Sequence, residues 1–223
     1  MSTETTNTNK LREFVDELKR LKVEVIRPDI NDCFPDFRTS KNIILYGLGA
    51  IKNVGSEAIS NLVKEREKNG KFKSLMDFVK RVNPKDINKL QLEGLVKSGA
   101  FDKIEKNRKG IFDTIPKIIQ LNKIFHEEKI SKQSNLFDNS ETSKTETLKL
   151  NTKDQWDTKE FLSEEFKSLG FYISDHPLND YKNIFNQLDI KPYKDFLAGK
   201  KNDSLIAGTL MSIQEKKKFK RNS

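Results

Sequence analysis

A five-residue segment holds the residue types that could bind a phosphate group through the protein backbone. Lys52-Asn-Val-Gly-Ser56 lies between two short apolar helical patterns. Gly55 accepts positive φ without a Cβ clash, and Asn53 is the next most tolerant residue type at such a position. A tight turn here would expose backbone N–H donors at the start of the next helix, where the helix dipole also favours an anion. The segment predicts a phosphate contact, and a plain helical corner remains the alternative.

The helix after the turn must hold these donors in place. Ser56 is expected as the N-cap of a helix over residues 57–68, and Gly70 is expected to end that helix. Val54 should point back into the helix pair and keep the turn closed. Two helices joined in this way form a helix-hairpin-helix module, which would contact the sugar-phosphate backbone of DNA rather than its bases.

The charge balance agrees with a polyanionic partner. The chain has 42 Lys and Arg against 33 Asp and Glu, a formal net charge of +9, which would attract nucleic acid. An AT-rich genome also enriches Lys, Asn and Ile, so that explanation of the charge stays open.

The single cysteine and the lack of long apolar runs exclude several classes. Cys33, with two histidines in the chain, can form neither a disulfide framework nor a zinc site, and we expect a reduced thiol. No run approaches the roughly 18 apolar residues of a membrane span, and the polar N-terminus has no signal-peptide core. We therefore expect a cytoplasmic chain with no membrane partner.

Hydrophobic periodicity predicts a mainly α chain. Helices are expected at residues 9–23, 74–82, 86–97, 107–128, 158–167 and 179–188, with a small β-hairpin formed by 34–38 and 42–46. Between 129 and 157 the composition is polar and no helical period survives, which indicates a flexible linker. Alternating apolar residues at 203–215 indicate a β-type stretch whose partner strand is not in the chain.

The linker contains two adjacent large apolar residues. Gln133-Ser-Asn-Leu-Phe137 would leave Leu136 and Phe137 as exposed apolar surface unless a partner's pocket buried them. The pattern is short enough to arise by chance, so a plain linker remains the alternative.

Four blocks, in their order and spacing, carry a specific resemblance. They are Arg27-Pro-Asp-Ile-Asn31, Tyr46-Gly-Leu-Gly-Ala-Ile-Lys-Asn-Val-Gly55, Leu95-Val-Lys-Ser-Gly-Ala-Phe-Asp102 and Leu169-Gly-Phe-Tyr-Ile-Ser-Asp-His-Pro-Leu178. Together they resemble the alpha subunits of bacterial DNA polymerase III, the C-family replicative polymerases. The resemblance covers essentially the whole chain but only an internal portion of that longer protein.

The resemblance implies a division into five parts. These are the end of the fingers region at 1–42, a tandem helix-hairpin-helix DNA-binding domain at 43–128, a flexible linker with a clamp-binding motif at 129–157, a helical connector at 158–200, and the truncated, incomplete start of an OB-fold domain at 201–223.

The resemblance also implies roles for particular residues. DNA contacts to the primer-template duplex would come from a first hairpin and from Arg108 in a second, more degenerate one; the first-hairpin residues are Lys52, Asn53, Val54, Gly55 and Ser56. The family more often has glycine at the position of Asn53. Gln133, Leu136 and Phe137 match the motif for the sliding clamp, or beta subunit, with the two apolar side chains in its pocket. Other holoenzyme subunits are further implied partners.

Catalytic residues are expected elsewhere in the full polymerase. Two-metal nucleotidyl transfer requires converging carboxylates, and no Asp-x-Asp pair occurs in the chain. Asp29 and Asp32 are interpreted as turn and cap residues, and His176 before Pro177 as a structural turn residue. We therefore predict no catalytic residue, no metal ligand and no cofactor in this chain, with Mg²⁺ expected for the full polymerase only. The isolated chain should bind DNA and clamp without polymerising nucleotides.

Two other hypotheses belong to different classes of protein. One is a free-standing, non-enzymatic DNA- and clamp-binding adaptor; because the resemblance is cut at both ends, we favour an incomplete gene product. The other is the helix-hairpin-helix part of a repair ligase or nuclease, which would not account for the third and fourth blocks together.

Overall fold

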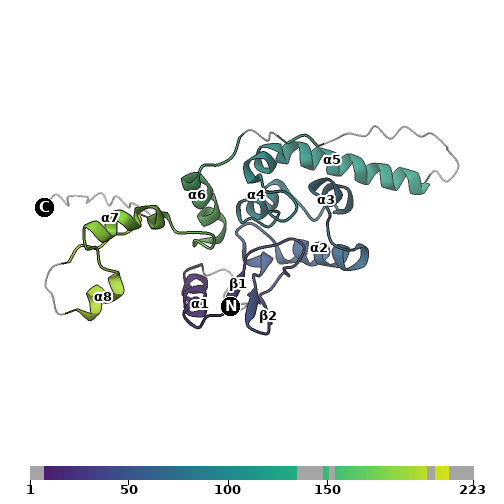
Figure 1. The fold of residues 1–223 in the computed structure, drawn as a ribbon. Helices are drawn as coiled ribbons and strands as arrows, with labels where there is room; N and C mark the ends of the chain where they lie inside the picture. The colour runs from purple at the N-terminus through teal and green to yellow at the C-terminus, as the bar shows by residue number, and fades with distance from the viewer. Residues whose placement is uncertain (1–7, 135–147, 151–153, 200–203, 211–223) are drawn as a thin grey trace, which may run out of the picture. The chain divides into compact units, whose positions relative to one another are not determined.

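The computed structural model describes residues 8–134, 148–150, 154–199 and 204–210 (Figure 1). Two compact units are present, Met1–Ser174 and Asp175–Ser223. The first unit contains most of the helices: α1 (Thr8–Arg20), α2 (Ser56–Asn69), α3 (Leu75–Arg81), α4 (Lys89–Lys97), α5 (Arg108–Ser134) and α6 (Thr158–Leu169). The predicted mainly α class is confirmed.

A three-stranded sheet accompanies these helices. It consists of β1 (Glu24–Ile26), β2 (Arg38–Ser40) and β3 (Ile43–Leu45) in the order β1-β3-β2. β2 and β3 are antiparallel, which confirms the predicted hairpin in a shortened form. β1 pairs with β3 in parallel and was not predicted, because three residues are too few to show a period of two.

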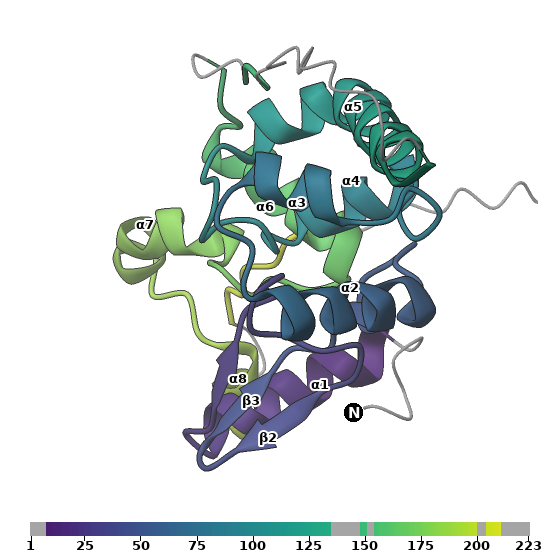
Figure 2. The ribbon, with the colours of Figure 1, turned by 90° about the vertical axis from the view of Figure 1, so that its right-hand side faces the viewer.

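The core of the first unit lies between the helices and the sheet. In Figure 2, α2 lies between the sheet and the pair α3 and α4. The rings of Phe72, Phe78 and Phe101 pack edge to face, with centroids 5.2 Å and 5.0 Å apart along the row. All three rings are buried, so they join α3 to the segments before and after it.

The block at residues 27–31 ties this core together through polar contacts. The Asp29 carboxylate accepts hydrogen bonds from the N–H groups of Asn31 (2.7 Å) and Asp32 (3.0 Å), as its predicted turn role requires. The Asn31 side chain bonds the backbone N–H and carbonyl of Phe72, each at 2.8 Å. Arg66 of α2 donates to the Ile30 carbonyl at 2.7 Å. The block therefore fastens α2 and the start of α3 to one loop.

Asp32 forms ion pairs instead of capping a helix. Its carboxylate contacts Lys71 at 2.5 Å and also Lys103. Burial alone would raise the pKa of Asp32, but the hydrogen bonds from these two lysines outweigh it and hold the pKa below its ordinary value. The neighbouring Cys33 is a free thiol, and burial raises its pKa to about 11, so it is protonated at neutral pH.

Part of the predicted linker continues a helix, and other residues of it pack against the core. α5 continues to Ser134, beyond the expected end of that helix, and Leu148, Leu150 and Trp156 pack against the core. The ring of Trp156 lies 5.7 Å from that of Phe112 in α5. Residues 135–147 and 151–153 lie outside the described part of the chain. A polar composition concealed these anchors, because single apolar residues carry no periodic signal.

The second unit contains η3 (Pro177–Tyr181), α7 (Lys182–Gln187) and α8 (Tyr193–Ala198). His176 caps η3, since its Nδ1 accepts the N–H of Leu178 at 3.2 Å, which agrees with the structural role expected for it. α8 was not predicted. The expected β-type stretch forms no strand over residues 204–210, and its continuation lies outside the described residues.

The described residues form neither a helix that could span a membrane nor a cluster that could hold a metal ion. No helix among them has the length and apolar content needed to cross a membrane. Within the same residues, no three His, Cys, Asp or Glu side chains gather in a way that could hold a metal ion.

Candidate nucleic-acid interface

The predicted hairpin lies between η2 (Leu48–Ala50) and α2. Gly49 lets these two elements approach closely, because a Cβ built on it would lie 2.6 Å from the Ser56 Oγ and 2.9 Å from the Pro35 carbonyl oxygen. The turn itself covers residues 51–55, in which Ile51 and Val54 are buried and the other three residues are exposed.

Other helices hold the turn in position from behind. The N–H of Lys52 donates to the carbonyl of Ser168 in α6 at 3.0 Å, and that of Val54 donates to Ile51 at 3.1 Å. Val54 is 6% exposed, and it faces Gly94 of α4, where a built Cβ would lie 2.7 Å from the Lys52 carbonyl oxygen. The prediction that Val54 closes the turn is confirmed, and α4 and α6 both position the hairpin.

The backbone geometry of the turn decides between Gly55 and Asn53 as the left-handed residue and corrects the predicted cap. Gly55 has φ −78° and ψ 136°, whereas Asn53 has φ 65°, so Asn53 and not Gly55 takes the left-handed conformation. Gly55 is the N-cap of α2 and Ser56 is its first helical residue, so the predicted Ser56 cap is wrong. The left-handed Asn53 completes the turn early, and the helix therefore starts one residue sooner. Its end at Gly70, with φ 82°, is as predicted.

The first turn of α2 leaves its backbone donors without an acceptor in the described part of the chain. Gly55 has no side chain with which to cap, and no hydrogen bond from a side chain replaces it. Among the described residues, no acceptor takes the N–H groups of Ser56, Glu57 or Ala58. Lys52, Asn53, Gly55 and Ser56 are all exposed. Exposed donors of this kind, together with the positive end of the helix dipole and a lysine, suit an anion.

The chain's own structure does not require glycine at position 55. Its φ is accessible to any residue, and a Cβ built there would meet only the Gln91 Nε2, at 3.5 Å, which is an ordinary contact. The missing side chain instead leaves open space in front of the first turn of α2, where a ligand could approach the backbone closely.

Arg108 lies in a second helical pair, formed by α4 and α5. Its side chain is 3% exposed, and it donates to both carboxylate oxygens of Asp102 at 2.8 Å and 2.6 Å. Further contacts reach the Lys97 carbonyl at 2.9 Å and the buried Glu165 carboxylate at 3.8 Å. The guanidinium group fills the space beside Gly99, whose φ is 82°. Arg108 therefore fastens the turn between α4 and α5 to Glu165 of α6. Because its guanidinium group is buried and engaged, Arg108 is not among the proposed phosphate contacts.

The residues implied for clamp binding are only partly described. Gln133 lies in the last turn of α5. Leu136 and Phe137 lie outside the described residues. The described chain resumes at Leu148.

Comparison with known proteins finds relatives that match nearly the whole chain. A family model described as a helix-hairpin-helix motif matches residues 22–111. DNA polymerase III subunit alpha of Borreliella burgdorferi is 36% identical over 221 residues, covering 96% of this chain and 19% of that protein. The subunit of Campylobacter jejuni is 32% identical over 225 residues, with 99% and 18% covered, and that of Caulobacter vibrioides is 36% identical over 180 residues, with 81% and 16% covered.

The chain spans less than a fifth of the length of these curated relatives. The matched region includes the exposed hairpin with its accessible N–H groups, the left-handed Asn53 and the buried Val54. The chain belongs to the DNA polymerase III alpha subunit family and corresponds to one stretch of these longer proteins.

Proposed function

We propose that this chain is the part of a replicative DNA polymerase that binds the backbone of duplex DNA without sequence preference and tethers the enzyme to the sliding clamp. The exposed first turn of α2 is the observation that carries the DNA part of the proposal. Its N–H groups at residues 56–58 have no acceptor among the described residues, and the open space at Gly55 lets a phosphate approach them.

The position of the hairpin supports a rigid binding element. Its loop is bonded to α6 through Lys52 and packed on α4 through Val54, so the donors keep a fixed direction. A preorganised site spends less free energy on ordering when it binds. The same proposal includes DNA-templated synthesis by the whole polymerase and its need for Mg²⁺. It also includes a cytoplasmic location and contacts with other holoenzyme subunits.

The DNA part is tested by the salt dependence of binding. We expect the chain to bind two unrelated duplexes of equal length with the same affinity, because backbone contacts carry no sequence information. The logarithm of the binding constant should fall linearly with the logarithm of salt concentration, by about 0.9 for each phosphate neutralised. Fluorescence anisotropy from 50 to 200 mM salt measures both. A marked preference for one duplex, or an affinity that salt leaves unchanged, would contradict the proposal.

The clamp part is tested with Leu136→Ala and Phe137→Ala combined. Buried apolar anchors cost about 2 kcal/mol or more each when truncated, so the double variant should no longer be captured by immobilised clamp. Duplex binding should stay intact, because the hairpin is untouched. The pair Thr145→Ala and Thr147→Ala, in the same stretch, serves as the control and should retain capture. Undiminished capture of the Leu136 and Phe137 variant would remove this motif from the clamp site.

A further inference from the structure

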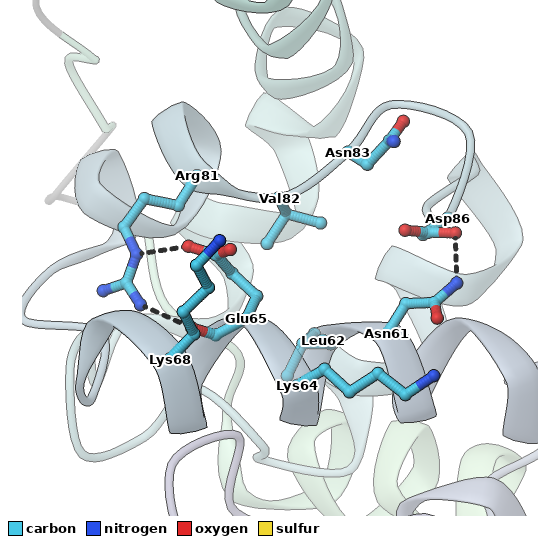
Figure 3. Close-up of a pocket in the computed structure, with 9 residues that line it drawn as sticks. All are labelled: Asn61, Leu62, Lys64, Glu65, Lys68, Arg81, Val82, Asn83 and Asp86. Carbon is cyan, nitrogen blue, oxygen red and sulfur yellow. Dashed lines mark hydrogen bonds and ion pairs between the residues drawn. The ribbon is translucent and has the colours of Figure 1, made fainter.

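A groove runs beside α2, on the side that faces the turn between α3 and α4 (Figure 3). Its volume is about 240 Å³. One wall is α2, the other is the segment that follows α3, and the lining residues are Asn61, Leu62, Lys64, Glu65, Lys68, Arg81, Val82, Asn83 and Asp86. We propose that Lys64 and Lys68 bind backbone phosphates of the same DNA duplex whose backbone the hairpin contacts. This inference rests on the proposed function and extends the contact surface along α2.

Each carboxylate of the groove has a hydrogen-bond partner, but within the described part of the chain only Glu65 is paired with a positive charge. Glu65 accepts a hydrogen bond from Arg81 Nε at 3.1 Å, and Asp86 accepts one from Asn61 Nδ2 at 2.8 Å, as Figure 3 shows. Arg81 is itself fully engaged, since it also donates to Asp77 at 3.0 Å and to the Gly70 carbonyl at 2.7 Å. The Glu65 carboxylate therefore opposes an incoming phosphate only weakly, whereas Asp86, bonded to a neutral amide, keeps its charge at the far end of the groove.

The positive charges of the rim are not paired. Lys64 and Lys68 are exposed, and neither forms an ion pair with any described residue. Asn83 adds a neutral donor on the opposite wall, because its Oδ1 accepts the N–H of Lys85 at 2.9 Å and its amide nitrogen is left for a ligand. Two ammonium groups and an amide around one groove match the chemistry of phosphate oxygens.

The spacing fits a polymer that continues from the hairpin. Lys64 and Lys68 are one helical turn apart, and at a rise of 1.5 Å per residue they lie about 12 and 18 Å along α2 from Ser56. A base pair of B-DNA rises about 3.4 Å, so these distances correspond to roughly four to five base pairs. The segment from Arg81 to Gln91 follows α2 over this length, since Gln91 lies beside Gly55 and Arg81 beside Glu65. One backbone strand could therefore contact both sites.

An acidic segment of a partner protein is the competing occupant, but the groove favours a phosphate backbone. The floor residues Leu62 and Val82 are 1% and 5% exposed, so they offer little apolar surface to a peptide side chain. The lining residues classed as exposed are the two lysines and Asn83, which can bind regularly spaced charges without an apolar anchor. Peptide grooves usually gain affinity from such anchors.

The test is the salt dependence of duplex binding by the double variant Lys64→Gln and Lys68→Gln. Loss of two phosphate contacts should make the slope of log binding constant against log salt shallower by about 2 and weaken binding about tenfold or more at 100 mM salt. Lys117→Gln and Lys123→Gln on α5 form the matched control, because both are exposed and the charge change is the same. The control should keep the slope of the unsubstituted chain, and urea unfolding should show equal stability for both variants.

The outcomes separate this inference from the proposed function. If the groove variant and the control have the same slope while Gly55→Asp weakens binding, the groove inference is overturned and the hairpin stands. If none of the three changes binding, both fail. If the groove variant loses affinity for poly-glutamate but not for duplex DNA, the groove belongs to an acidic protein partner and the inference is overturned.

Discussion

Arg108→Met should lower the free energy of unfolding by about 3–5 kcal/mol, because it breaks a buried ion pair and leaves its partner without compensation. Arg108 and Glu165 are 3% and 0% exposed, so solvent cannot replace the lost charge. Glu165 would keep hydrogen bonds from the N–H groups of Ile173 (2.9 Å) and Ser174 (3.0 Å), but it would face no guanidinium group. The change would also remove the two bonds to Asp102 that hold the second turn.

Urea unfolding followed by circular dichroism measures this effect. Arg12→Met on the exposed side of α1 is the matched control and should change stability by less than about 0.5 kcal/mol. Adding Glu165→Gln to Arg108→Met should recover part of the loss, because the uncompensated carboxylate is then removed. A loss below about 1 kcal/mol for Arg108→Met would show that the network does not fasten α6 to the second helical pair.

Local signals in the sequence predicted several helix ends, although the Ser56 cap of α2 and the end of α5 were wrong. Ser74 accepts the N–H of Asp77 at 3.1 Å as the cap of α3, and Gly170 ends α6 in the left-handed conformation with φ 84°. Such caps depend on a few neighbouring residues, so the sequence around them contains the needed information. The hairpin at Lys52 to Ser56 was recognisable for the same reason.

Features that depend on distant partners could not be predicted. The DNA contact expected of Arg108 came from the family resemblance alone, and its buried partner Glu165 lies 57 positions further along the chain. The pairing of β1 with β3 and the packing of Trp156 on Phe112 likewise arise only in the folded chain. Residue type made both Gly55 and Asn53 candidates for a left-handed conformation, and only the folded chain shows that Asn53 adopts it.

Gly55→Asp should weaken duplex binding about tenfold or more without destabilising the protein. Gly55 is the N-cap of α2 with φ −78°, a conformation that aspartate adopts readily, and aspartate is among the best N-cap residues. A built Cβ meets only the Gln91 Nε2, at 3.5 Å, so no clash is introduced. The new carboxylate would accept the exposed N–H groups of the first turn and repel a phosphate. Stability and binding should therefore change in opposite directions.

Gly55→Asn separates the two causes of the loss. Asparagine caps the helix nearly as well but carries no charge, so it should weaken binding less than aspartate and with a similar gain in stability. The difference between the two variants should shrink as salt is raised, because the repulsion is screened.

Duplex affinity of Gly55→Asp, measured by anisotropy at 100 mM salt beside its unfolding free energy, tests the central claim most directly. The account predicts a stability equal to or above that of the unsubstituted chain and a binding constant lower by about tenfold or more. An unchanged binding constant in an equally stable variant would show that DNA does not contact the first turn of α2.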